Sequence, residues 1–166
     1  MRIGILSDTH GRVPNAAAAL KVLAHADVEH YLHCGDVGDE GVLDLLAGLP
    51  IAVVWGNNDY DRAHLADYAR RLGILIYDDL ADITLAGKRI AVTHGDNSAL
   101  LHQLLNAQQH DYIFQGHTHV AADERFGRTR LINPGALHRT ARPSVAVLDT
   151  QTDVLRVLSV AIAGRR

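Results

Sequence analysis

The chain opens with MRIGILSDTHGRVPNAAAALKVLAHADVEHYLHCGD, residues 1–36, and this stretch decides the fold class. The apolar run Arg2–Ser7 is typical of a short buried strand and is followed by a polar loop that contains glycine. Pro14 then precedes Asn15–Ala24, whose alanine and leucine content predicts a helix with proline near its first turn. The next apolar run is Tyr31–Cys34. Strand, loop, helix and strand in this order predict an α/β layer with a largely parallel sheet.

The same alternation continues to residue 72. A second helix is expected at Gly41–Leu49, because Pro50 cannot continue it, and Ile51–Trp55 predicts a third strand. A third helix is expected at Asp61–Leu72. We therefore expect three neighbouring parallel strands in the first half of the chain.

The second half of the chain is richer in strands. Ala81–Leu85 and Arg89–Thr93 alternate in polarity around a glycine-containing turn and predict a hairpin. One helix is expected at Ser98–Gln109, and the other expected strands are Tyr112–Gln115, Ala122–Phe126, Arg130–Ile132, Ser144–Leu148 and Val154–Val160. This content predicts two packed sheets with helices outside them. We expect one domain over residues 1–166, because no linker, repeat or low-complexity tract interrupts it.

Composition excludes several classes of protein. The 166 residues are 48% hydrophobic and 21% charged, which is an ordinary globular balance and not that of a disordered chain. A formal net charge of −3 offers no basic field for an extended nucleic-acid surface or an anionic membrane. No apolar stretch reaches the roughly 18 residues of a membrane-spanning helix. The single cysteine, Cys34, suits a reducing compartment, so we expect a cytoplasmic protein.

Histidine, aspartate and asparagine side chains gather where the apolar strands end. They are Asp8, His10, Asp36, Asn57, His94, His117 and His119. Because ligand sites of α/β sheets lie at the carboxyl ends of the strands, we expect these side chains to meet. In an extended chain, residues two apart point the same way, so we expect this of the pairs Asp8 with His10 and His117 with His119.

Seven ligands are too many for one zinc ion, which takes about four. They suit two divalent cations roughly 3.5–4 Å apart, as in two-metal hydrolases. Mixed imidazole and carboxylate ligands suit manganese, iron, zinc or nickel better than calcium.

Each motif also has an ordinary explanation when taken alone. Asp8 or Asp36 can simply form a turn or cap a helix, and Asn58 with Asp59 can form a turn and the N-cap of the next helix. Among the other histidines, His33 is interpreted as a packed core residue and His138 is left open as a residue that faces the site. The remaining ones are expected to be solvated: His25, His30, His64, His102 and His110. Only the joint occurrence of the motifs at strand ends favours a metal site.

In their order the motifs resemble those of the calcineurin-like metallophosphoesterases. The segments, in chain order, are D-x-H at residues 8–10, G-D at 35–36, G-N-N-D at 56–59, T-H-G at 93–95, G-H-T-H at 116–119 and N-P-G at 133–135. The short chain is similar to the small YfcE-like phosphodiesterase branch, and the matching segments span residues 3–135.

This resemblance implies a four-layer αββα sandwich of two mixed sheets flanked by helices. It implies two divalent metal ions, with manganese favoured and nickel, iron or zinc as alternatives. The ligands of the first would be Asp8, His10, Asp36 and His119. Those of the second would be Asn57, His94 and His117, together with Asp36 as the bridge.

The sequence departs from the family at Asn58, where many members have a histidine that protonates the leaving group. Asparagine can donate a hydrogen bond to a phosphoryl oxygen but cannot deliver a proton. Asn58 is therefore the expected catalytic residue, acting as a donor to phosphate. A second departure is Asp96, where relatives often have another histidine.

The expected function is hydrolysis of small phosphodiesters, nucleotide-derived ones included, by in-line attack of a metal-bridging hydroxide. A phosphomonoesterase or nucleotide phosphatase with the same site is one alternative. The other is a protein-interaction scaffold like Vps29, although such relatives have lost or altered metal ligands and here all seven positions are filled. A homodimer or a higher homo-oligomer is compatible with the sequence.

Overall fold

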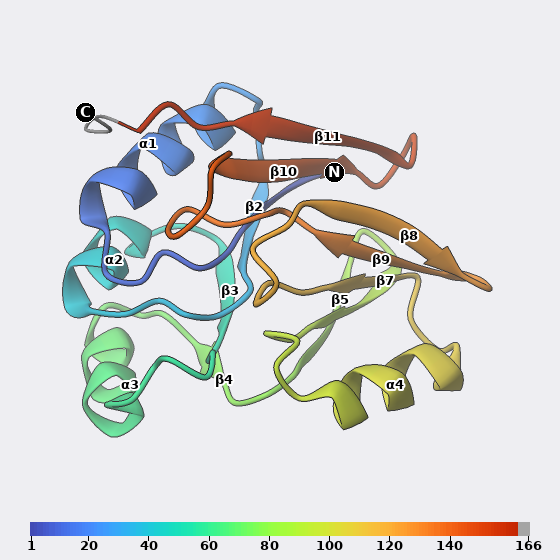
Figure 1. The fold of residues 1–166 in the computed structure, drawn as a ribbon, viewed down its shortest axis with the longest axis horizontal. Coiled ribbons are helices and arrows are strands. Elements are labelled where there is room, and N and C mark those ends of the chain that lie inside the picture. Colours follow the sequence, from blue (N-terminus) through green and yellow to red (C-terminus); the bar gives the residue numbers. More distant parts are fainter. Residues whose placement is uncertain (163–166) are drawn as a thin grey trace.

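The structure is a computed structural model that describes residues 1–162 (Figure 1). Its six-stranded sheet has the order β11-β10-β1-β2-β3-β4. These strands are β1 (Arg2–Leu6), β2 (His30–His33), β3 (Ile51–Val54), β4 (Ile76–Tyr77), β10 (Ser144–Asp149) and β11 (Val154–Ser159). The five-stranded sheet has the order β5-β6-β7-β9-β8. Its strands are β5 (Ala81–Leu85), β6 (Lys88–Val92), β7 (Tyr112–Phe114), β8 (Ala122–Phe126) and β9 (Thr129–Asn133).

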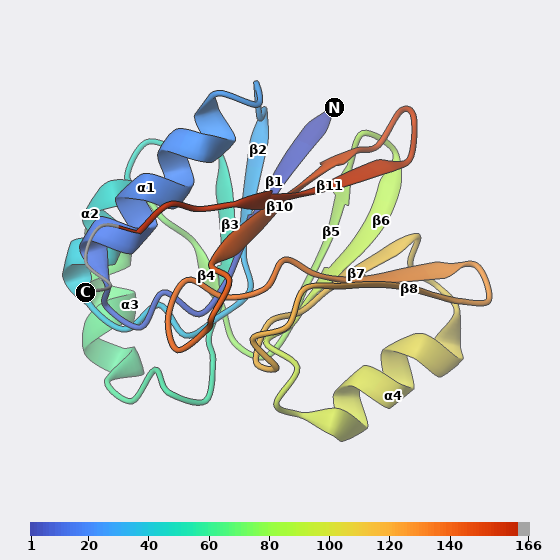
Figure 2. The same ribbon diagram turned by 45° about the horizontal axis from the view of Figure 1, so that its top comes forward.

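The two sheets pack face to face, and helices cover their outer faces. The helices α1 (Val13–Ala24), α2 (Glu40–Leu46) and α3 (Arg62–Arg71) lie on the outer side of the six-stranded sheet, whereas α4 (Ser98–Ala107) lies beyond the other sheet (Figure 2). This arrangement confirms the predicted four-layer αββα sandwich. Strands β1 to β4 are parallel, as expected for the first half of the chain, and β10 joins β1 antiparallel.

The main hydrophobic core lies between the sheets. From the six-stranded sheet it includes Ile3, Ile5, Leu32 and Val54, and from the other sheet Ile90, Val92, Phe114 and Ile132, all fully buried. A separate cluster on the outer face of β1 joins Leu6 to Ala19 and Leu23 of α1. Both faces of β1 are therefore buried, which is why its sequence is continuously apolar.

Several element boundaries differ from the predicted ones. Helix α2 begins at Glu40, because the Asp39 side chain accepts a hydrogen bond from the Val42 N–H, and it ends at Leu46, before the predicted Leu49. Gln108 at a φ of 51° ends α4 two residues early. The two-residue strand β4 was not predicted, because two residues are too few to form a pattern.

Other expectations concern the chain as a whole. The prediction of one domain over residues 1–166 includes residues 163–166, which lie outside the described residues. Within residues 1–162, none of the helices has the length and apolar composition needed to cross a bilayer. Cys34 is a free, fully buried thiol.

Candidate metal centre

All seven expected ligands lie in loops that follow strands of both sheets, at the carboxyl ends of β1, β2, β3, β6 and β7. Backbone hydrogen bonds connect these loops: the His10 N–H donates to the Asp36 carbonyl at 2.9 Å, and the Gly116 N–H donates to the His94 carbonyl at 2.9 Å. The ends of the strands therefore bring together segments that are far apart in the sequence.

Asp8 is the buried centre of the first group of ligands. Its Oδ1 lies 3.1 Å from His119 Nε2 and 3.9 Å from His10 Nε2. One ligand atom from each of these three residues lies within 4.8 Å of the other two. Two imidazoles and a carboxylate thus converge on one point.

Asp36 lies between this group and a second one. Its Oδ2 is 3.4 Å from His10 Nε2 and also 3.4 Å from His94 Nε2. Asn57 Oδ1 is in turn 3.1 Å from His94 Nε2 and 3.1 Å from His117 Nδ1. Short contacts therefore link all seven side chains in one continuous chain, with Asp36 near its middle.

The residues fit metal ions by their chemistry and by their unmet hydrogen-bonding capacity. Asp8 Oδ1 and His10 Nε2 are buried and have no hydrogen-bond partner among the described residues. Burying such atoms unpaired destabilises a protein by about 1–3 kcal/mol each. A bound divalent cation would remove this penalty, and the imidazole, carboxylate and amide oxygen ligands suit a first-row transition ion.

The charges in the site are strongly coupled. Burial raises the pKa of Asp8. Burial also acts to raise the pKa of Asp36, but hydrogen bonds with His94 and Asn58 hold it below its usual range. For His94 burial acts to lower the pKa, yet hydrogen bonds to the Asp36 carboxylate and the Cys34 carbonyl raise it to about 9. A metal ion at His94 must therefore displace a proton.

Backbone carbonyls orient two of the imidazoles. His94 Nδ1 lies 2.8 Å from the Cys34 carbonyl oxygen, which turns Nε2 towards Asp36. His119 Nδ1 lies 3.5 Å from the Arg139 carbonyl oxygen, with Nε2 towards Asp8. Such partners fix the ring orientation of metal-binding histidines.

His33 supports the loop that carries Asp36. The Thr9 hydroxyl donates to the Val37 carbonyl at 2.9 Å and lies 3.0 Å from His33 Nε2. Burial lowers the pKa of His33 to about 3, so the ring is neutral near pH 7. His33 is a packed core residue, as interpreted from the sequence.

The expectation of extended backbone at the paired ligands is wrong. Five ligands have a positive φ of 46° to 64°: Asp8, His10, Asp36, His117 and His119. Left-handed backbone at non-glycine residues stores about 1–3 kcal/mol each and is concentrated at functional sites. The side chains converge because the chain turns sharply at each ligand, not because it continues as a strand.

Two glycines allow the ligand loops to approach one another. A Cβ at Gly56 would overlap both Asp36 Oδ1 and the Asp36 backbone nitrogen. A Cβ at Gly116 would lie 2.8 Å from Asp8 Oδ2 and would overlap the Ser7 hydroxyl. Neither site has room for a methyl group unless a ligand moves.

We expect Gly56→Ala to lower kcat/KM at least about 100-fold, because displacing a ligand by about 1 Å can lower a rate by that factor. Steady-state kinetics on metal-loaded protein measures the effect. Gly73→Ala is the control: it strains a positive φ of 75°, a strain that Gly56→Ala does not introduce, and its Cβ meets no atom of residues 1–162 within 4 Å. Activity of Gly56→Ala within threefold of wild type would contradict the expectation.

Asn58 and Tyr60 lie beside the bridge position. Asn58 donates from its backbone N–H to Asp36 Oδ1 and from Nδ2 to Asp36 Oδ2, both at 2.8 Å. The Tyr60 hydroxyl donates to Asn58 Oδ1 at 3.0 Å, and Tyr60 is 85% exposed. Sequence reasoning missed Tyr60, because a single loop tyrosine carries no signal of its own.

Other polar residues are placed by the structure in ways the sequence left open. His138 lies beside the site, with its ring centroid 5.4 Å from that of His10. Asp59 does not cap α3, which Asp61 caps; it instead accepts hydrogen bonds from the N–H groups of Gly38 and Gly56.

The structure also shows the exposure of the five histidines that were expected to be solvated, and of Asp96. His110 is buried near Asp82, so the expectation that it is solvated is wrong, and His30 is half-buried. His25, His64 and His102 are exposed as expected, and Asp96 is exposed too.

A two-sheet αββα sandwich with clustered carboxylates and imidazoles at the carboxyl ends of its strands defines a metal-dependent hydrolase class. Residues 1–153 match the family model of the calcineurin-like phosphoesterase superfamily domain. The chain belongs to this superfamily, and it is a metallophosphoesterase.

Individual relatives agree with this assignment. Phosphodiesterase MJ0936 of Methanocaldococcus jannaschii is 30% identical over 156 residues, which cover 91% of this chain and 94% of the relative. The solved structure of an archaeal phosphodiesterase has a TM-score of 0.89 at 29% identity and covers 96% of this chain and 100% of its own. The structure of the Escherichia coli phosphoesterase YfcE has a TM-score of 0.67 at 21% identity and covers 97% of this chain and 100% of its own. This likeness supports the fold alone.

Proposed function

We propose that this metallophosphoesterase hydrolyses small phosphodiesters, nucleotide-derived ones included. The observation that carries the proposal is the unbroken chain of contacts through all seven ligand side chains, centred on Asp36. The printed name of the Methanocaldococcus jannaschii relative, a phosphodiesterase, supports the choice of ester.

We assign the ligands of two divalent cations accordingly. Asp8, His10, Asp36 and His119 hold the first, and Asn57, His94 and His117 hold the second together with Asp36. Manganese is favoured, with nickel, iron or zinc as alternatives. The equal distances from Asp36 Oδ2 to His10 and His94 support its role as the shared ligand.

The chain's own residues position the substrate. When bound, divalent cations lower the pKa of a coordinated water and neutralise charge on phosphoryl oxygens. Asn58 Nδ2 has two N–H groups and gives one to Asp36, which leaves the other for a phosphoryl oxygen. The exposed Asn57 and His117 mark the side on which substrate enters.

The amide of Asn58 supports a diester over a monoester. A phosphomonoester carries nearly two negative charges at neutral pH, because its second pKa is about 6, whereas a diester carries one. A neutral amide with a single free N–H compensates less charge than the imidazolium that many relatives would supply at this position. The lower charge of a diester therefore matches this site better.

The experiment compares p-nitrophenyl phosphate with bis(p-nitrophenyl) phosphate on protein reconstituted with Mn²⁺. We expect kcat/KM for the diester to exceed that for the monoester at least about tenfold. A faster monoester would favour the phosphomonoesterase alternative. No hydrolysis of either ester at two bound metals per chain would favour the Vps29-like scaffold.

The single cysteine, Cys34, is a free buried thiol, and the absence of a disulfide supports a cytoplasmic setting. Light scattering of the same preparation distinguishes a monomer from the homodimer or higher homo-oligomer that the sequence allows.

A further inference from the structure

A groove of about 630 Å³ adjoins the metal centre: His119 is part of its lining, and none of the other six expected ligands is. Its walls come from the loop after β7, the loop between β9 and β10, and the edge strand β11. Its size falls within the range of about 300–1,000 Å³ typical of small-molecule sites. Its lining includes Val120, Arg139, Arg142, Val157 and Ser159.

The groove is physically joined to the metal centre. His119 faces Asp8 with Nε2, and on its other side Nδ1 lies 3.5 Å from the carbonyl oxygen of Arg139. Arg139 has a φ of 50°, so its backbone is strained at the point where it meets a ligand. A substrate whose phosphorus lies at the metals can therefore reach the groove with an adjacent substituent.

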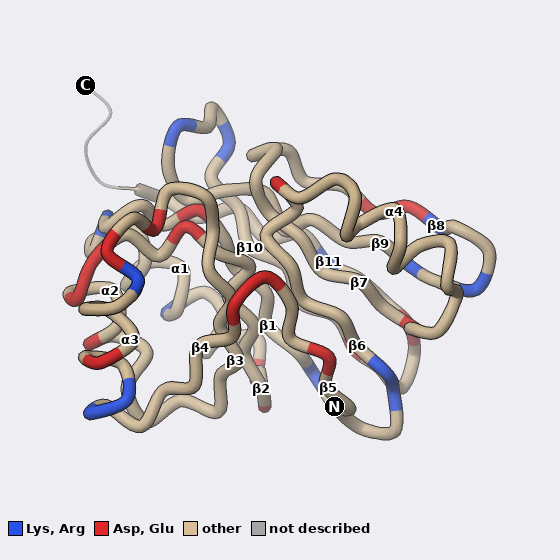
Figure 3. Tube along the Cα trace, turned by 90° about the horizontal axis from the view of Figure 1, so that it is seen from below, with Lys and Arg blue, Asp and Glu red and all other residues tan. Residues whose placement is uncertain are grey.

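The charge in the groove has one sign. Among residues 1–162, Arg139 and Arg142 line it, and no aspartate or glutamate does. The loop between β9 and β10 carries two separate basic positions and no acidic one (Figure 3). Within residues 1–162 neither guanidinium has a carboxylate at ion-pair distance, whereas Arg130 lies between Asp123 and Asp153. Free guanidinium groups match the geometry of phosphate.

The walls also offer surface for an uncharged group. Val120 is 65% exposed and Val157 is 47% exposed, so both offer apolar surface in the lining of the groove. The hydroxyl of Ser159 adds a hydrogen-bonding group. Apolar surface, hydroxyls and two arginines together match the base, sugar and phosphate of a nucleotide.

We propose that the groove binds the substituent of the diester that lies beyond the scissile phosphorus, and that this substituent is a nucleoside that carries one further phosphate group. This inference rests on the proposed phosphodiesterase function. Arg139 and Arg142 bind the further phosphate, and Val120 and Val157 pack against the nucleoside.

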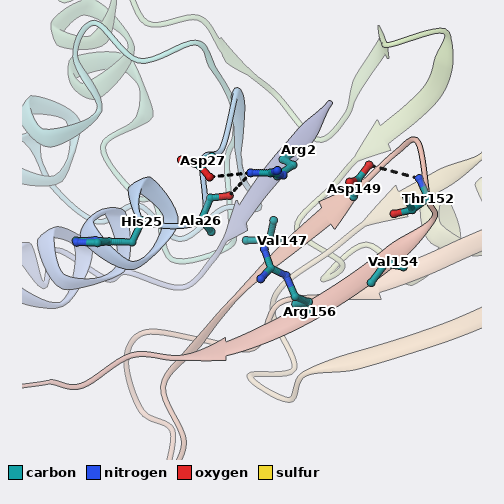
Figure 4. A pocket seen from close by; sticks show the side chains of 9 residues that line it. All are labelled: Arg2, His25, Ala26, Asp27, Val147, Asp149, Thr152, Val154 and Arg156. Carbon is teal, nitrogen blue, oxygen red and sulfur yellow. Dashed lines mark hydrogen bonds and ion pairs between the residues drawn. The ribbon is translucent and has the colours of Figure 1, made fainter.

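A cavity at the opposite end of β1 offers a matched control. It measures about 440 Å³, and its lining includes Arg2, Asp27 and Arg156 (Figure 4). Arg2 is already paired with Asp27 at 2.9 Å. Arg156 lies on β11, as Val157 does, but it lines this distant cavity, so Arg156→Gln removes one positive charge without touching the groove.

The test uses three diesters with the same p-nitrophenolate leaving group. They are ethyl p-nitrophenyl phosphate, the p-nitrophenyl ester of thymidine 5′-phosphate, and this second ester with an added 3′-phosphate. In each case water cleaves the P–O bond to p-nitrophenolate and leaves the other substituent as a phosphomonoester. For wild type we expect kcat/KM to be highest for the 3′-phosphorylated ester.

In the double variant Arg139→Gln/Arg142→Gln, the ratio of kcat/KM for the 3′-phosphorylated ester to that for the ethyl ester should fall at least about tenfold, mainly through KM. Arg156→Gln should leave the ratio unchanged. An unchanged ratio in the double variant, or a wild type that does not favour the added phosphate, would overturn the proposal.

Calorimetric titration with thymidine 3′,5′-bisphosphate tests the groove separately from activity. Binding to wild type that is weakened at least about tenfold in the double variant supports the proposal, even if none of the three esters is hydrolysed and the proposed function fails. Equal binding to both proteins, or binding to neither, would overturn it.

Discussion

Replacing Asp36 with asparagine is expected to lower kcat/KM for phosphodiester hydrolysis at least about a thousandfold. Asp36 Oδ2 lies 3.4 Å from the imidazoles of both His10 and His94, so in the proposed assignment the substitution removes a charge that both cations share. The Asp36 carboxylate accepts two hydrogen bonds from Asn58, one on each oxygen. The asparagine side chain has only one oxygen that can accept. Steady-state kinetics and elemental analysis of bound metal measure the two effects together.

Asp67→Asn is the matched control for this substitution. Asp67 is an exposed residue of α3 that pairs with Arg70 at 2.6 Å. Its substitution removes the same single negative charge far from the ligands. We expect its kinetics to equal those of wild type. The assignment of Asp36 would fail if Asp36→Asn kept activity within tenfold of wild type while it still bound two metals.

Removal of metal ions with a chelator is expected to abolish hydrolysis and to lower Tm. Ligand present at about 100 times its Kd stabilises a folded protein by roughly 2.7 kcal/mol, and in a domain of this size about 1 kcal/mol changes Tm by roughly 2–4 °C. A fall in Tm of roughly 5–10 °C is therefore expected, because Asp8 and His10 again hold buried atoms that have no hydrogen-bond partner among residues 1–162. Differential scanning calorimetry and activity after re-addition of Mn²⁺ measure both effects.

The affinity for metal ions is expected to depend on pH. In the metal-free protein the pKa of His94 is raised to about 9, so His94 carries a proton near pH 7. Metal binding near pH 7 should then release about one proton, and affinity should rise with pH until about pH 9. Titration in buffers of different ionisation enthalpy counts the proton. In Asp36→Asn the chelator should change Tm far less; a decrease equal to that of wild type would place the metals elsewhere.

Much of the fold follows from local patterns in the sequence. The alternation of apolar strands and helices in residues 1–72 predicted the parallel half of the six-stranded sheet. The hairpin of β5 and β6 was predicted from its alternation, and its turn places Ala86 and Gly87 at φ values of 50° and 74°. Patterns of this kind are strong because burial on one or both faces of a strand restricts the residue types directly.

The identity of the candidate ligands also follows from sequence. Asp8, Asp36 and His94 each lie within three residues of the end of a strand, and strand ends of both sheets meet at one place. The position of a ligand after a strand in the sequence thus predicts its place at the ligand-binding edge of the sheet, provided that the strands and their connections are assigned correctly.

The directions of the ligands and their partners depend on the tertiary structure. His94 is oriented by the carbonyl of Cys34, 60 residues away, and His119 lies against the carbonyl of Arg139. Every residue carries the same backbone carbonyl group, so a contact with a carbonyl cannot be predicted from the residue types in the sequence. The left-handed backbone at Asp8 and His10 could not be predicted from the sequence either. Aspartate and histidine adopt this conformation where the surrounding packing holds them in it.

The sequence by itself therefore determined the layers, the strand ends and the residue types of a metallophosphoesterase centre. The tertiary structure alone decided that Asp36 lies between two groups of imidazoles and that Tyr60 contacts Asn58. It also decided that two arginines with no acidic partner within residues 1–162 adjoin His119. The physical reason is that burial acts on each residue locally, whereas these contacts join loops whose relative positions are set only when the two sheets pack together.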